Sequence, residues 1–262
     1  MIGGTYWYIV LQTSLQFAFF MAQWEEYHTH VLPHCAGKWC GVTEVNYSMG
    51  ILTLVNGFMD RETFWHRPMT EVLAPLGDSV MQHIPSIVKE LELRHFGMAG
   101  WGLMSAILMI LSLKRVLFHP HIAGGNLSAA ETFQMRVTAL SKLATPAALC
   151  VAAFMVPPTA VRTRYLSVTL GLAFSILTKK MIVFSMAKMK FAAVQFDAVP
   201  LLLAALWIRY DKRLTKEGAD LVLGVLCFWY TFRMLRWINI TINQICKKLD
   251  INCFTLGKRK KE

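Results

Sequence analysis

Long apolar segments dominate this chain and restrict it to one class of fold. Lys, Arg, Asp and Glu are all absent before Glu25, and further apolar segments recur to the end of the sequence. A segment of roughly 17 to 25 mostly apolar residues is long enough to cross a bilayer. Backbone amides find no water in hydrocarbon, and these segments do not alternate with period two, so we expect each to be helical. The sequence therefore predicts an all-α, polytopic integral membrane helix bundle.

We expect about seven transmembrane helices in a single membrane domain over residues 1–262. The second candidate is short. The least apolar stretch, 60–94, separates the second candidate from the third, and we expect a surface loop there, with an interfacial helix in IPSIVKELELRHF. The seven candidates are 5–23, 45–58, 97–118, 138–156, 165–187, 192–210 and 221–245.

The charge of the chain indicates a membrane surface rather than nucleic acid. Hydrophobic residues make up 55% and charged residues 16% of the chain, and the net charge is +11. Much of the positive excess lies in the tail and in short loops beside apolar segments, which is typical of proteins bordered by anionic lipid headgroups. Lys258 and Lys260 fit a K-x-K-x-x retrieval signal of the endoplasmic reticulum, which is read from the cytosol. A basic tail attracted to anionic lipid is the alternative explanation.

Charged residues inside the predicted spans are functional candidates. A charge at mid-bilayer costs roughly 2.5 to 3.5 kcal/mol on insertion scales, so such a residue should face the bundle interior or a watery cavity. The fifth span contains Lys179 and Lys180, and the seventh contains Arg233 and Arg236, which share a helix face and suit a phosphate or lipid headgroup. Asp197 is the expected buried counter-charge. Snorkelling to an interface, a structural ion pair and the anion route of a transporter remain as alternatives.

Two E-x-x-H pairs, Glu25 with His28 and Glu92 with His95, raise the question of a di-iron site. The additional bridging carboxylates that such a site needs are missing from the apolar segments. A second cluster has no common zinc spacing, and polar residues where a helix leaves the membrane explain it better. That cluster is His28, His30, His34, Cys35 and Cys40.

Several stretches together resemble one protein family. In FFMAQWEEYHTHVL, the residues Trp24, Tyr27, Thr29 and Leu32 match the pattern W-[EQ]-x-Y-x-[ST]-G-x-L, although His30 replaces its glycine. GVTEVNYSMGIL follows, similar to a D-V-T-E-x-x segment. The run ILTKKMIVFSMAKMKF resembles I-T-N-K-L-V-V-A-H-M. The remaining matches are Lys180, Asp197, Arg236, Asn243, Gln244 and Ile245.

These stretches, in this order, resemble the choline and ethanolamine phosphotransferases of the CDP-alcohol phosphatidyltransferase class-I family. The resemblance implies a ten-span enzyme of the endoplasmic reticulum or Golgi, for which a homodimer is one possible assembly. The retrieval signal in the tail predicts a cytosolic C-terminus. Members of the family transfer the phosphoalcohol of CDP-choline or CDP-ethanolamine to diacylglycerol, giving a phospholipid and CMP. Carboxylates of D-G-x2-A-R-x8-G-x3-D-x3-D hold Mg²⁺ or Mn²⁺ on the pyrophosphate.

That metal motif is absent from this sequence, because no aspartate is followed by glycine and no two are four residues apart. We therefore expect the chain to resemble the C-terminal seven spans of the family, to bind no metal through these motifs, and to be inactive alone. A non-catalytic lipid-binding or regulatory protein of the same ancestry is the alternative. The sequence predicts no catalytic residue. The candidates for a substrate and lipid chamber are Trp24, Glu25, Tyr27, Lys180, Asp197, Arg233, Arg236 and Asn243.

Overall fold

The computed structural model describes residues 6–32, 47, 50, 51, 54, 57–77, 85–123 and 128–251. The chain divides into two compact units. The N-terminal unit comprises Met1–Ala147 with Lys180–Val194, and the C-terminal unit comprises Ala148–Lys179 with Gln195–Glu262.

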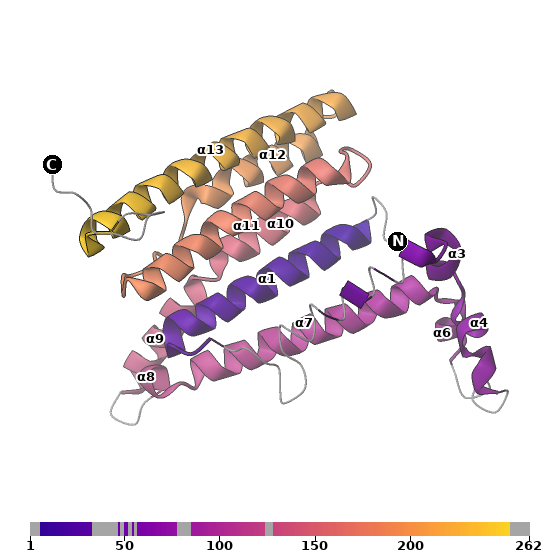
Figure 1. The fold of residues 1–262 in the computed structure, drawn as a ribbon, viewed down its shortest axis with the longest axis horizontal. Helices are drawn as coiled ribbons and strands as arrows, with labels where there is room; N and C mark the ends of the chain where they lie inside the picture. The colour runs from indigo at the N-terminus through magenta and orange to yellow at the C-terminus, as the bar shows by residue number, and fades with distance from the viewer. Residues whose placement is uncertain are drawn as a thin grey trace. The chain divides into compact units, whose positions relative to one another are not determined.

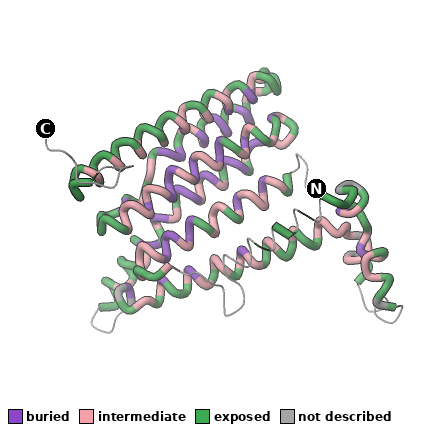
Figure 2. Tube along the Cα trace, viewed as in Figure 1, coloured by how far each residue is buried: buried purple, intermediate pink, exposed green. Residues whose placement is uncertain are grey.

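In the N-terminal unit, two long helices run along each other: α1 (Tyr6–Thr29) and α7 (Leu93–Leu117) (Figure 1). Bulky apolar side chains of α1, including Phe20 and Trp24, are fully buried, as is Val116 on α7. Figure 2 shows buried positions recurring along α1. The shorter elements of this unit are α3 (Arg61–Trp65), α4 (Met69–Leu73), η1 (Ala74–Leu76), α6 (Ser86–Glu90), α8 (Pro120–Ala123) and α9 (Ala129–Ser141).

Polar side chains set where α7 and α9 begin. At α9 the Ser128 hydroxyl accepts from the Glu131 amide, and the Glu131 carboxylate accepts from the Ser128 amide at 2.9 Å. At α7 the Glu92 amide donates to His95 Nδ1 at 3.3 Å. Such reciprocal caps satisfy amides that lack a partner in the first helical turn.

The C-terminal unit contains most of α10 (Ala144–Met155) and α11 (Thr163–Met186), together with η2 (Phe196–Ala198), α12 (Val199–Tyr210) and α13 (Lys216–Leu249). The Thr169 hydroxyl of α11 donates to the Leu223 carbonyl of α13 at 3.1 Å, which joins these two helices. Asp220, near the start of α13, accepts from the Arg162 amide at 2.8 Å and also contacts its guanidinium.

The turn that follows α12 is held by a carboxylate. Asp211 Oδ1 accepts from the Arg213 amide at 2.9 Å, and Asp211 Oδ2 accepts from Trp207 Nε1 at 3.0 Å. The backbone hydrogen bond from Arg213, and next the side-chain hydrogen bond from Trp207, lower the pKa of Asp211 below its ordinary value. The chain is thereby turned from α12 toward α13.

The all-α, polytopic membrane class predicted from the sequence is confirmed. By length and composition, four helical stretches of the described part can cross a membrane: Leu93–Leu117, Ala129–Met155, Thr163–Met186 and Lys216–Leu249. They correspond to the predicted third, fourth, fifth and seventh spans. α9 and α10 supply the second of these stretches, with a break at residues 142–143.

The other three predicted spans fare differently. The 24-residue α1 is not among the four stretches. The sixth candidate, 192–210, becomes helical only with η2 and then the 12-residue α12, which at about 1.5 Å per residue is shorter than a hydrocarbon core. Most of 45–58 lies outside the described residues. The predicted interfacial helix is a five-residue α6, and LRHF already belongs to α7.

Candidate functional site

Glu25 is buried on the last turns of α1 and pairs with a cation on α7, which is 90 residues away in the sequence. Its carboxylate accepts two hydrogen bonds from the Arg115 guanidinium. Arg115 Nε donates to Glu25 Oε1, and Arg115 Nη2 donates to Glu25 Oε2 at 2.9 Å. The Glu25 side chain is 4% exposed and the Arg115 side chain 41% exposed. A bidentate pair of this kind fixes orientation as well as charge. α1 continues through Glu25 to Thr29, so this carboxylate lies within the helix and faces the unit interior.

Trp24 and Tyr27 bind backbone groups of the same unit. Trp24 Nε1 donates to the Ala139 carbonyl of α9 at 2.9 Å, and the indole is fully buried. The Tyr27 hydroxyl donates to the Met189 carbonyl at 3.1 Å and accepts from the Phe191 amide at 3.0 Å. The W-x-x-Y residues thus hold α1 to α9 and to the segment that follows α11.

A buried lysine completes this cluster. Lys142 is 8% exposed, its ammonium lies 3.3 Å from His28 Nε2, and it sits 4.3 Å from the centre of the Tyr27 ring. Burial, and next the Lys142 ammonium, lower the pKa of His28 to about 3. Neutral His28 can accept a hydrogen bond from the ammonium, and the Tyr27 ring adds a cation–π contact. We name Trp24, Glu25, Tyr27, Arg115 and Lys142 the α1 polar cluster.

In the C-terminal unit, Asp197 meets a cation as the sequence predicted. Asp197 is 2% exposed, and its Oδ1 lies 3.2 Å from Arg233 Nη2 on α13. The Tyr230 hydroxyl, one turn before Arg233, donates to the Asp197 carbonyl at 2.7 Å. Arg233 also stacks 4.9 Å above the Trp229 ring. The pair with Asp197 neutralises Arg233.

The other predicted chamber residues lie on α11 and α13. Lys180 is half-buried near the end of α11 and belongs to the N-terminal unit. Lys179 donates to Met234 Sδ at 3.2 Å. Arg236 and Asn243 are exposed on α13, whereas the sequence led us to expect Arg236 in the interior; Asn243 donates to Asn239 at 3.2 Å.

The E-x-x-H pairs have structural partners other than metal. Glu92 contacts Arg94 Nε at 2.6 Å and His66 Nδ1 at 2.9 Å, while His95 caps α7. Within the residues that the structure describes, no group of three His, Cys, Asp or Glu side chains could hold a metal ion. The described donor set therefore does not fit a divalent metal. His34, Cys35 and Cys40 lie outside the described residues.

Sequence reasoning missed Arg115 and Lys142, although a signal for both was present. Each lies within a predicted apolar span, 97–118 or 138–156. The argument that singled out Lys179 and Arg233, a charge inside an apolar segment, applies to them equally. The pairing itself could not be read from the sequence, because Glu25 and Arg115 are 90 residues apart.

The fold and these ion pairs define a polytopic helical membrane protein with charges buried between its helices. No family model matches the chain. Among curated proteins it is similar to "Uncharacterized CDP-alcohol phosphatidyltransferase class-I family protein 3" of Dictyostelium discoideum. The two are 24% identical over 261 residues, an alignment covering 92% of this chain. The chain spans 61% of the length of that relative. The comparison supports the resemblance at the level of the family and says nothing of choline or ethanolamine.

Proposed function

We propose that this chain provides the lipid-binding helices of a CDP-alcohol phosphotransferase of phospholipid synthesis. The observation that carries the proposal is the similarity to a relative named for that family, which extends along nearly the whole chain. The four apolar helical stretches agree with an enzyme whose acceptor is a membrane lipid. The proposed acceptor is diacylglycerol, the donor CDP-ethanolamine or CDP-choline, and the location the endoplasmic reticulum or Golgi membrane.

We further propose that these 262 residues alone do not catalyse the transfer. A pyrophosphate donor needs divalent metal to neutralise its charge and to orient the displacement. The aspartate motif that would hold Mg²⁺ or Mn²⁺ is absent from the sequence, and the described donor set does not fit such an ion. What this chain would contribute is the binding and orientation of lipid beside a metal centre held by other residues.

The α1 polar cluster is the proposed polar end of the lipid chamber. Its fixed indole and phenol, with the Glu25–Arg115 pair, join α1 to α7, α9 and the segment after α11. In this proposal the helix arrangement that these contacts hold is the one that accepts the diacylglycerol hydroxyl.

Photolabelling tests the proposal. The chain is purified, reconstituted in nanodiscs and exposed to a diacylglycerol that carries a photoreactive group near its hydroxyl. We expect adducts on the last turns of α1, with unlabelled diacylglycerol reducing them and triacylglycerol leaving them unchanged. Adducts spread evenly over all apolar helices would refute a diacylglycerol chamber.

A further inference from the structure

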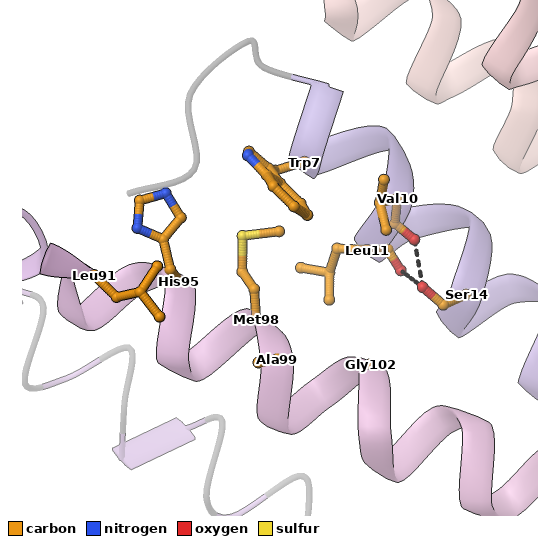
Figure 3. Close-up of a pocket in the computed structure, with 9 residues that line it drawn as sticks. All are labelled: Trp7, Val10, Leu11, Ser14, Leu91, His95, Met98, Ala99 and Gly102. Carbon is orange, nitrogen blue, oxygen red and sulfur yellow. Dashed lines mark hydrogen bonds between the residues drawn. The ribbon is translucent and has the colours of Figure 1, made fainter. Parts of the chain in front are cut away.

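A cavity of about 380 Å³ lies between α1 and α7 in the N-terminal unit (Figure 3). Leu11 of α1 and Met98 of α7 project into this space, and the small residues Ala99 and Gly102 of α7 leave room beside them (Figure 3). Cavities that bind small molecules have volumes of about 300–1,000 Å³ and apolar walls with a few polar groups. This cavity is therefore large enough for a small apolar ligand.

The helix that forms one wall of the cavity is suited to a membrane. α7 is one of the four stretches that can cross a bilayer, and only 11% of its apolar window is buried inside the protein. An apolar cavity against such a helix is within reach of molecules dissolved in the hydrocarbon core. We therefore expect a ligand that enters from the bilayer and is apolar over most of its length.

Two N–H donors lie at one end of the cavity. Trp7 and His95 line this end, and their rings meet edge-on with centroids 6.4 Å apart (Figure 3). His95 Nδ1 accepts from the Glu92 amide at 3.3 Å, so the proton of the neutral imidazole is on Nε2, and the indole Nε1 of Trp7 is also a donor. Among the residues that the structure describes, neither of these two nitrogens has a hydrogen-bond partner.

The third polar side chain of the lining lies elsewhere. Figure 3 places Ser14 at the opposite end of the cavity from His95, and its hydroxyl donates to the Val10 and Leu11 carbonyls of α1. The described side chains at the His95 end thus offer two donors and no unoccupied acceptor. A ligand group that only accepts, such as a carboxylate, would satisfy both donors, whereas a hydroxyl would bring a proton that these side chains cannot accept.

We infer that the α1–α7 cavity binds a long-chain fatty acid. Its carboxylate accepts hydrogen bonds from Trp7 Nε1 and His95 Nε2, and its hydrocarbon chain lies between the two helices. Hydrogen bonds to an ionised acceptor are roughly twice as strong as those between neutral groups. Trp7 is 50% exposed, so the carboxylate stays near water. The charge of the neighbouring Glu92 is compensated, because Glu92 contacts Arg94 at 2.6 Å. This inference uses the cavity alone and does not rest on the proposed function.

Photolabelling of the full chain in phosphatidylcholine nanodiscs tests this inference, using palmitic acid that carries a diazirine in its chain. We expect adducts at Leu11 and Met98, mapped by mass spectrometry. Gly102→Leu adds a side chain to the cavity wall, where a Cβ meets no atom within 4 Å. It should reduce labelling about tenfold, the effect of losing roughly two buried methylene contacts. Gly100→Leu is the matched control, because Gly100 has equal room on the same helix and is not among the described residues that line the cavity.

A second variant tests the donors. Trp7→Phe keeps an aromatic ring and removes one N–H, so competition by unlabelled palmitic acid should weaken about tenfold. Competition by methyl palmitate, whose carbonyl is uncharged, should weaken only about threefold. Trp101→Phe makes the same change on α7 at a tryptophan outside the described lining, and it should alter neither competitor.

Hexadecanol has the same chain length and a hydroxyl in place of the carboxylate. In the unchanged protein it should compete at least about tenfold more weakly than palmitic acid, because its proton finds no acceptor at the Trp7 and His95 end. Equal labelling of the Gly102→Leu and Gly100→Leu proteins, or equal competition by hexadecanol and palmitic acid, would overturn the inference.

Discussion

At the residue scale, Glu25 and Arg115 show how unequal the two halves of an ion pair can be. The Glu25 side chain is almost fully buried, whereas 41% of the Arg115 side chain is exposed. Removing the cation leaves a buried charge without compensation, while removing the carboxylate leaves a cation that water or headgroups can still reach. The cost of breaking the pair therefore depends on which residue is changed.

Arg115→Met should lower the free energy of unfolding by about 2–3 kcal/mol, and Glu25→Gln by about 1 kcal/mol, because glutamine can still accept from Arg115. Thermal unfolding in detergent micelles measures both. Lys114→Met is the control, since Lys114 is exposed beside Arg115 on α7. A larger loss for Glu25→Gln than for Arg115→Met would contradict the buried position of the carboxylate.

The Tyr27 hydroxyl holds the segment after α11 through two backbone hydrogen bonds. Tyr27→Phe keeps the ring beside Lys142 and removes both hydrogen bonds. We therefore expect the free energy of unfolding to fall by about 1–2 kcal/mol and the Phe191 amide to exchange faster. Thermal unfolding measures the first change, and hydrogen exchange followed by mass spectrometry measures the second. Tyr210→Phe, at an exposed tyrosine, should leave the exchange unchanged. Unaltered Phe191 exchange in Tyr27→Phe would rule out this role.

At the scale of elements, α13 is the helix on which charge placement matters most. Only 11% of its apolar window is buried, and yet Tyr230 and Arg233 from adjacent turns both bind Asp197, one at its backbone carbonyl and one at its carboxylate. This double contact fixes η2, which leads into α12. The exposed Arg236 three residues later provides an internal comparison on the same helix.

Arg233→Met should destabilise the C-terminal unit by roughly 2 kcal/mol, less than the 3–5 kcal/mol of a fully buried pair because Arg233 is partly exposed. Arg236→Met should change stability by under about 0.5 kcal/mol. Thermal unfolding of both variants in the same detergent is the measurement. Equal losses of stability in the two variants would show that the ion pair between Asp197 and Arg233 does not stabilise the unit.

The sequence predicted the long helices well, because a long apolar segment in hydrocarbon must form a helix to satisfy its own backbone hydrogen bonds. The predicted 165–187 and the observed Thr163–Met186 differ by two residues at the start and one at the end. Shorter elements could not be placed in this way: nothing in 192–210 marked the 3-10 turn before Val199. The break at residues 142–143 was also unforeseen, and it places Lys142 beside Tyr27.

At the scale of the whole molecule, the chain comprises two compact units, and candidate residues occur in both. Asp197 was predicted as a counter-charge from its apolar neighbours alone, whereas its choice of Arg233 over a lysine depends on helix packing that periodicity does not encode.

Release of CMP by the purified, reconstituted chain tests the central claim most directly. The protein is incubated with diacylglycerol, Mg²⁺ or Mn²⁺, and CDP-ethanolamine or CDP-choline, and CMP and phospholipid are quantified together. Diacylglycerol photolabelling of the same preparation shows that the helices are folded. The account predicts labelled protein and no CMP above protein-free vesicles. Stoichiometric formation of CMP and phospholipid by these 262 residues alone would contradict it.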